Sequence, residues 1–143
     1  MSLRGPFSSR ACIVCGRENK IGLGLAYWAG DGASRAEWTV APQFCGIPGF
    51  LHGGLILALL DDAMWYAAFG DGGFTMTAEA TVRYRAPVRQ GQQVEVSGRV
   101  LKRTGRLWRL AAELREVDGG LLATAEGKFL EVEPTDLGLV GGP

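Results

Sequence analysis

Two carboxylates stand side by side in an otherwise apolar stretch of the sequence. Asp61 and Asp62 interrupt residues 55–69, which otherwise contain only Leu, Ile, Ala, Met, Trp, Tyr and Phe. Burying an unpaired charge among such side chains is costly. Each carboxylate therefore points into a solvent gap or an interface, pairs with an arginine or a backbone amide, or serves as a catalytic acid or base. Composition alone leaves these alternatives open.

A pair of glycines comes shortly before these acids. His52, Gly53 and Gly54 follow a Pro- and Gly-rich segment, residues 41–51, and begin a run that favours a helix. The N–H groups of a first helical turn are unpaired and favour negative charge, and glycine lets another molecule's carbonyl approach closely. The pair can therefore form an oxyanion hole for an acyl group. Relief of crowding where a loop enters a helix explains it equally well.

Helical geometry relates the two features to each other. At about 100° per residue, Asp61 returns to almost the same face as Gly54, whereas Asp62 points about 80° away. Asp61 is therefore the better partner for the start of the helix. Seven residues along a helix span about 10 Å, which is too far for Gly54 and Asp61 of one chain to meet at one carbonyl. A site that combines them needs two chains, and a two-fold dimer would supply two such sites.

The elements that must position these residues form an α+β pattern. The helix predicted over residues 53–69 is apolar almost all the way round, so we expect it to be buried on most sides. Alternating apolar and polar residues, separated by short turns, predict strands over residues 22–29, 34–40, 75–87, 92–101, 106–117 and 121–132. The strands linked by these short turns should be antiparallel neighbours. A curved antiparallel sheet wrapped around one central helix accounts for the order, with one domain over residues 1–143, a core over about 12–132 and a flexible tail over 133–143.

Composition narrows the classes of partner. Fifteen basic and fifteen acidic residues give a net charge of zero, which argues against a nucleic acid or an anionic membrane surface as partner. No signal peptide is visible, and the longest apolar stretch is too short to span a bilayer. Three cysteines, an odd number, indicate reduced thiols. We therefore expect a cytoplasmic protein.

The residues around the glycine pair resemble a known family. The run Gly46-Ile47-Pro48-Gly49-Phe50-Leu51-His52-Gly53-Gly54, followed by Leu59-Leu60-Asp61, is similar to the signature of hotdog-fold thioesterases of the phenylacetate-pathway (PaaI-like) type, with an acid nine residues after the His. Two further runs match: Arg83-Tyr84-Arg85-Ala86-Pro87 resembles the end of the family's long third strand, and Cys12-Ile13-Val14-Cys15-Gly16 is common among such proteins. The resemblance covers roughly residues 12–132.

The resemblance implies a hotdog fold and hydrolysis of an acyl-CoA thioester by a homodimer or a dimer of dimers. The Gly53 or Gly54 amide would polarise the thioester carbonyl, and the partner's Asp61 would act as general base on water or as nucleophile. Thr77 falls where some members place a hydroxyl that orients this water. His52 would mainly orient the loop and the hydrogen bonds of the active site, and proton transfer is its alternative role. Coenzyme A enters only as part of the substrate, and no separate cofactor is expected.

One departure from the family supports a second hypothesis. Several members carry an Asn six residues before the His, where this chain has Gly46. The chain could instead be a hotdog module that binds an acyl-thioester or a lipid without turning it over. A hotdog dehydratase or hydratase ranks lower, because the only histidine lies in the His-Gly-Gly run.

Two further groups of residues have both a functional and a structural interpretation. Cys12 and Cys15 have the spacing of metal ligands, but with one such pair a zinc ion would need Cys45, His52 or a second chain, so no metal is expected. Basic residues cluster around the turn at residues 102–106. Arg103 and Arg106 are candidates to bind the phosphates of coenzyme A, although a solvated turn explains the cluster slightly better.

Overall fold

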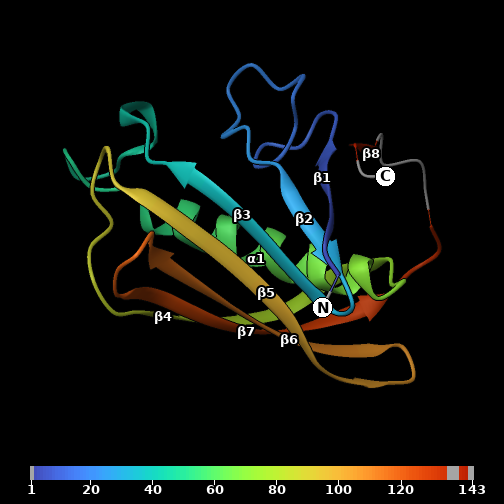
Figure 1. Cartoon of the computed structure of the whole chain (residues 1–143). Coiled ribbons are helices and arrows are strands. Elements are labelled where there is room, and N and C mark those ends of the chain that lie inside the picture. The colour runs from blue at the N-terminus through green and yellow to red at the C-terminus, as the bar shows by residue number, and fades with distance from the viewer. Residues whose placement is uncertain (1, 135–138, 142–143) are drawn as a thin grey trace.

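An eight-stranded antiparallel sheet curves around one long helix in the computed structural model of the chain, which describes residues 2–134 and 139–141 (Figure 1). The helix is α1 (Gly53–Gly70). The strands are β1 (Arg4–Ser9), β2 (Tyr27–Gly30), β3 (Ala33–Thr39), β4 (Thr75–Tyr84), β5 (Gln93–Thr104), β6 (Leu107–Glu116), β7 (Leu121–Glu131) and β8 (Leu139–Gly141). Their order in the sheet is β4-β7-β6-β5-β3-β2-β1-β8. The predicted α+β hotdog architecture is confirmed.

Short turns set the neighbours in the sheet, as the sequence predicts. Strands β5, β6 and β7 pair in succession, and β7 also pairs with the earlier strand β4. The β2–β3 hairpin turns at Asp31 and Gly32, which have φ values of 50° and 74° and so occupy the left-handed region that a tight hairpin requires. The first strand of this hairpin is shorter than predicted. Leu23 and Leu25 donate their N–H groups to Ile13 and Val14 in the N-terminal segment instead of joining the β2–β3 ladder.

Strand β1 is an element that the sequence did not predict. It pairs with β2 on one side and with β8 on the other. The tail predicted over residues 133–143 falls largely on residues outside the described part, 135–138 and 142–143. Within it, residues 139–141 form β8.

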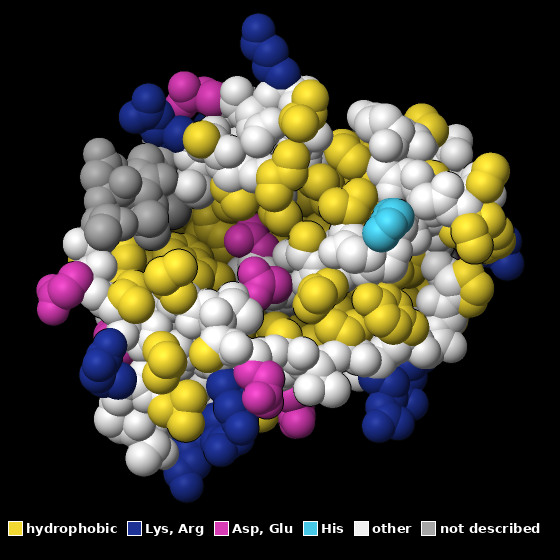
Figure 2. All heavy atoms as spheres, turned by 180° about the vertical axis from the view of Figure 1, so that it is seen from behind, with side chains coloured by type: hydrophobic (Ala, Val, Ile, Leu, Met, Phe, Trp, Pro, Cys, Tyr) yellow, Lys and Arg dark blue, Asp and Glu magenta, His cyan; other side chains and the backbone are white. Residues whose placement is uncertain are grey.

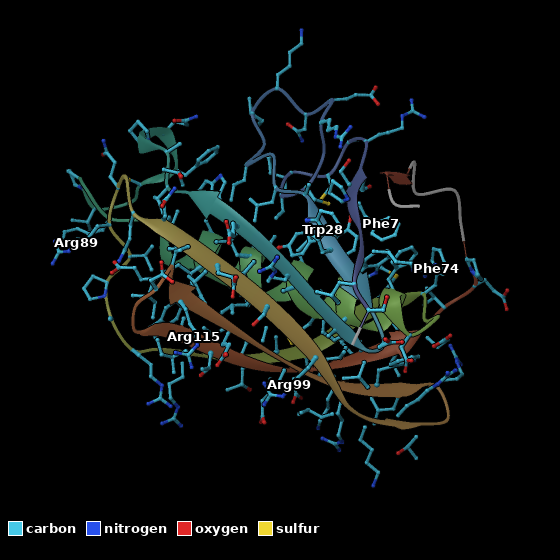
Figure 3. The ribbon with its side chains drawn as sticks, viewed as in Figure 1. Phe7, Trp28, Phe74, Arg89, Arg99 and Arg115 are labelled. Atoms are coloured by element: carbon cyan, nitrogen blue, oxygen red, sulfur yellow. The ribbon has the colours of Figure 1, made fainter. Side chains whose placement is uncertain are left out.

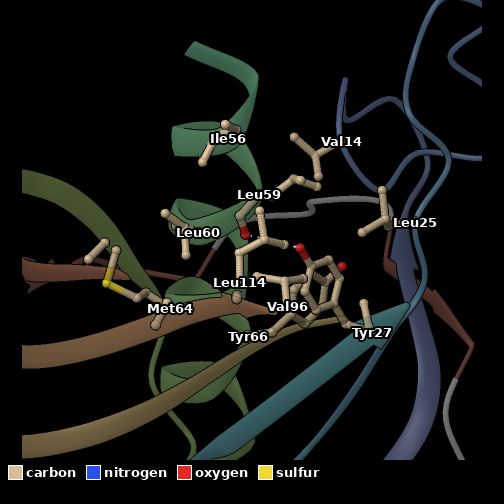
Figure 4. Close-up of a cluster of buried hydrophobic side chains, with 14 of the residues drawn as sticks. Val14, Leu25, Tyr27, Ile56, Leu59, Leu60, Met64, Tyr66, Val96 and Leu114 are labelled. Carbon is tan, nitrogen blue, oxygen red and sulfur yellow. Dashed lines mark hydrogen bonds between the residues drawn. The ribbon is translucent and has the colours of Figure 1, made fainter. Parts of the chain in front are cut away.

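The concave face of the sheet encloses the helix. Leu59, Leu60 and Tyr66 of α1 are fully buried against side chains of the sheet such as Val96 and Leu114 (Figure 4). The helix and β5 approach so closely that a Cβ atom at Gly98 would lie 2.3 Å from the carbonyl oxygen of Ala63. The prediction of a helix buried on most sides is therefore confirmed, and the buried apolar surface is the main force that holds α1 in place.

The outer face and one edge of the sheet are open. Arg99 and Arg115 extend from β5 and β6 on the face away from the helix (Figure 3). Strand β4 is the last strand of the sheet, and its Met76 and Tyr84 are 65% and 54% exposed. None of the described residues forms a helix with the length and hydropathy needed to cross a bilayer.

Candidate active site

The start of α1 is capped by the only histidine of the chain. His52 is the N-cap residue, and its Nδ1 accepts the N–H of Gly54 at 2.8 Å. Its carbonyl oxygen accepts the N–H groups of Leu55 and Ile56. The Gly53 N–H has no acceptor among the described residues. Of the two glycine amides that the sequence proposed for an oxyanion hole, only that of Gly53 is therefore available to a ligand.

A largely apolar cavity of about 500 Å³ adjoins this helix start. Its wall includes Ile47, Phe50, Leu51, Gly53, Ile56, Tyr84, Arg85 and Pro87. The Tyr84 hydroxyl donates to the Gly53 carbonyl oxygen at 2.9 Å, so it fixes the peptide next to the free amide. Sequence reasoning missed this role of Tyr84. The only signal was its place within the run of residues 83–87, at the end of a long strand.

Asp61 faces β4. The Thr77 hydroxyl donates to Oδ1 of Asp61 at 2.6 Å, so these two predicted site residues lie together in one chain. Burial raises the pKa of Asp61, and the hydrogen bond from Thr77 opposes that rise. The carboxylate is half-buried and lines a cavity of about 190 Å³ together with Trp65. Figure 2 shows acidic side chains surrounded by hydrophobic ones at the middle of the face of the molecule that lies opposite to the view of Figure 1. A carboxylate with a raised pKa accepts a proton well from a bound water.

Asp62 faces the N-terminal segment instead. Its Oδ2 atom is shielded from solvent and has no hydrogen-bond partner among the described residues. Burial raises the pKa of Asp62 to about 8. The two neighbouring acids therefore have different surroundings, and only Asp61 has a hydroxyl group to orient it.

Two cysteines adjoin Asp62. The Cys12 Sγ accepts the backbone N–H groups of Val14 and Cys15 at 3.3 and 3.4 Å. The Cys15 thiol, helped by these amides, lowers the pKa of Cys12 to about 6. The Cys15 Sγ lies 3.2 Å from the Tyr66 hydroxyl. Cys45 lies apart from this pair, in an isolated bridge with Leu51 near the start of α1.

Other predicted site residues are not brought together in one chain. Gly53 and Asp61 are eight residues apart on α1, which corresponds to about 12 Å. Arg103 and Arg106 lie on the β5–β6 hairpin, at the opposite end of the molecule from residues 42–52 (Figure 1). The Arg103 guanidinium lies 4.5 Å from the centre of the Trp108 ring and 3.7 Å from Glu131, whose carbonyl oxygen accepts a hydrogen bond from Arg106.

Gly46 packs against the capping histidine. A Cβ atom at position 46 would lie 3.0 Å from Cδ2 of His52, closer than most such contacts. An Asn at this position would therefore require the imidazole to move.

The wrapped helix, the histidine-capped glycine at its start and the acid nine residues after the His define a protein of the hotdog thioesterase class. The family model described as thioesterase superfamily matches residues 48–123, just over half of the chain. The chain belongs to this superfamily.

Individual relatives agree with this assignment. The acyl-coenzyme A thioesterase THEM4 of Bos taurus is 32% identical over 94 residues, which are 65% of this chain and 38% of the relative. The chain thus spans about two fifths of the length of the curated relatives it matches. A solved thioesterase superfamily protein has a TM-score of 0.80 and 30% identity, covering 85% of this chain and 61% of its own. PaaI of the E. coli phenylacetic acid degradation operon shares the fold, with a TM-score of 0.73, 21% identity and coverage of 79% and 83%.

Proposed function

We propose that the chain hydrolyses acyl-CoA thioesters as a homodimer. The observation that carries this proposal is the pairing of Asp61 with Thr77 beside a cavity, together with the free Gly53 N–H at the start of the same helix. The relative named above supports acyl-CoA as the substrate class, because its name describes that activity.

The proposed reaction uses one group from each chain. The Gly53 N–H donates to the thioester carbonyl oxygen as negative charge develops on it. The partner's Asp61 takes a proton from water while the water oxygen attacks the carbonyl carbon, and Thr77 holds this carboxylate in position. The C–S bond then breaks, and coenzyme A leaves as a thiol after it gains the proton. Direct attack by the carboxylate is the other route open to Asp61.

The open edge of β4 supports the dimer. An unpaired edge strand is a template for pairing with another strand. Thr77, which holds Asp61, and Tyr84, which holds Gly53, lie toward the two ends of β4. If two β4 strands pair antiparallel about a two-fold axis near Ala80 and Thr81, Thr77 of one chain lies beside the partner's Tyr84. This pairing carries Asp61 of one chain toward the partner's Gly53, and it does so twice per dimer.

The two cavities give the substrate a path through such a site. The apolar cavity beside Gly53 and the cavity beside the partner's Asp61 would flank the reacting carbon, one for the acyl group and one for the pantetheine arm. We retain Arg103 and Arg106 as residues that bind the phosphates of coenzyme A. The proposal includes assembly into a dimer of dimers and a cytoplasmic location, where the three free thiols stay reduced.

A hydrolysis screen tests the proposal. Purified protein is assayed on aromatic, short, medium and long acyl-CoA substrates, with release of the free thiol as the readout. We expect turnover of at least one substrate and its loss in Asp61→Asn. Full activity of Asp61→Asn on every substrate would exclude the mechanism.

Gly46 favours a second candidate function, that of a module which binds an acyl-thioester without hydrolysing it. A glycine offers no side-chain donor to the carbonyl, and the His52 ring leaves little room for one. Saturable binding of an acyl-CoA, with no thiol release from any substrate, would establish this module in place of the enzyme.

A further inference from the structure

A second group of chemically active side chains lies next to Asp61. These side chains line the same 190 Å³ cavity, but none of them has a chemical role in the proposed hydrolysis. The Sγ atoms of Cys12 and Cys15 and a carboxylate oxygen of Asp62 all lie within 4.8 Å of one another. The cysteines come from the N-terminal segment and the acid from α1, so groups up to 50 residues apart in the sequence converge at one point.

The backbone around the cysteines has the form of a metal-binding turn. The N–H groups of Val14 and Cys15 both point at the Cys12 sulfur, at 3.3 and 3.4 Å. Amides directed at a sulfur stabilise it as a thiolate, which is the form that binds metals. Gly16 closes the turn with an N–H bond of 2.8 Å to the Cys12 carbonyl oxygen. A Cβ atom at Gly16 would lie 2.5 Å from backbone atoms of Cys12, so no other residue fits there.

Asp62 offers an unused ligand atom at this point, although the Cys15 thiol stabilises its charged form. Its Oδ2 is buried and accepts no hydrogen bond among the described residues. A buried carboxylate oxygen without a partner is unfavourable, and a cation bound between it and the two sulfurs would remove that cost.

We propose that Cys12, Cys15 and Asp62 bind a divalent metal ion, with zinc as the best fit. Zinc takes thiolate and carboxylate ligands together, and a C-x-x-C pair is a common half of its sites. Zinc–sulfur bonds of about 2.3 Å place the ligands of one ion roughly 3.5–4 Å apart, so binding requires a contraction of about 1 Å. The fourth position of such an ion would face the 190 Å³ cavity that these residues share with Asp61, and a water molecule would complete the coordination.

A metal explains more of this arrangement than a disulfide does. A bond between the Cys12 and Cys15 sulfurs would leave the Asp62 oxygen without a partner. It would also leave unexplained why Asp62 lies beside the two sulfurs. The metal ties the N-terminal segment, residues 10–25, to the middle of α1, beside the residue proposed as catalytic base. This inference does not depend on thioester hydrolysis.

Metal binding to the whole protein, without substrate, tests the proposal. The protein is reduced, stripped of metal with a chelator and titrated with Zn²⁺ against a colorimetric zinc indicator, and separately with Co²⁺. We expect one ion per chain and, with Co²⁺, the charge-transfer absorption of a cobalt–thiolate bond. Cys12→Ser and Asp62→Asn should each weaken Zn²⁺ binding by at least about 100-fold, because even changes around metal ligands cost 10- to 100-fold. Cys45→Ser is the matched control and should bind as the original chain does.

Three results would overturn the inference. They are no Zn²⁺ binding by the reduced protein, cobalt absorption without a thiolate band, and unchanged affinity in Asp62→Asn. Asp62→Asn has nearly the shape of the original residue, so we expect it to fold, and circular dichroism and thermal unfolding would check this. The result therefore counts even if Cys12→Ser does not fold. Because the assay uses no thioester, its failure leaves the proposed hydrolase untouched, and absence of hydrolysis leaves the metal site untouched.

Discussion

Asp61 and Asp62 are neighbours on one helix, yet they lie in two different regions of the molecule. Asp61 faces β4 and receives a hydrogen bond from Thr77, whereas Asp62 faces the N-terminal segment and its cysteines. A turn of about 100° per residue is enough to separate them. The surroundings of a carboxylate thus decide its chemistry. An acid with a hydroxyl partner suits proton transfer, and an acid with a buried oxygen beside two sulfurs suits a cation.

The largest predicted effect distinguishes the two acids directly. We expect Asp61→Asn to lower kcat by about 10²- to 10⁴-fold, because it removes the proposed general base. Asp62→Asn should lower it by less than about tenfold, and Asp118→Asn, in an exposed turn, serves as the control for loss of a carboxylate. Steady-state kinetics on the best substrate of the screen measures all three. Equal losses at Asp61 and Asp62 would remove the distinction between them.

A methyl group at the start of the helix should have the next largest effect. In Gly53→Ala the added Cβ would lie 3.7 Å from the Tyr84 ring, an ordinary contact that the fold accepts. The methyl would nevertheless stand beside the free amide and hinder the carbonyl. We expect kcat/KM to fall by about 10- to 100-fold, within the effect of losing one oxyanion donor, with thermal stability unchanged. Unchanged kinetics would show that the Gly53 amide does not contact the substrate.

Thr77→Ala should change the pH dependence of the reaction. Asp61 must be ionised to act as base, so activity rises with pH through its pKa. The Thr77 hydrogen bond favours the ionised form, so its loss raises the pKa of Asp61 further. The acidic limb of the kcat profile should therefore move to higher pH, and the plateau should fall by less than about tenfold. Thr77→Ser keeps the hydroxyl and should keep the original profile. A limb that moves to lower pH would contradict this role.

The smallest predicted effect concerns the cap of α1. His52→Ala removes the acceptor of the Gly54 N–H and should lower the free energy of unfolding by about 1 kcal/mol. His52→Asn supplies another capping oxygen and should recover most of this loss. Urea unfolding monitored by circular dichroism measures both. If His52→Asn recovers the stability but its kcat/KM stays low, the imidazole also contacts the substrate.

The elements of the fold that could be predicted are mostly those encoded by local sequence patterns. The helix, the hairpin turn at Asp31-Gly32 and the alternating strands β5 to β7 are encoded by nearby residues. Strand β1 could not be predicted, because the sequence of Arg4–Ser9 contains Gly5 and Pro6 and does not alternate. Its pairing with β2 and β8 depends on the assembled sheet.

The features of the candidate site also divide into those that sequence spacing predicts and those that depend on the assembled fold. The angle along the helix was sufficient to separate Asp61 from Asp62, because it depends on sequence spacing alone. The choice of Gly53 over Gly54 depends on which amide the His52 ring occupies, and that contact is visible only in three dimensions. Asp62 meets Cys12 and Cys15 from a distant part of the chain, and sequence spacing does not reveal such a contact. The further ligands considered from the sequence were therefore Cys45 and His52.

The central claim is that each site combines Gly53 of one chain with the partner's Asp61. It is tested most directly by mixing two variants of reduced activity. Gly53→Ala and Asp61→Asn chains with different tags are co-expressed, and the dimer carrying one of each is purified by both tags. Our account predicts that this dimer recovers about half of the activity of the original dimer, because one of its two sites is intact. A mixed dimer no more active than its two parents would contradict the account.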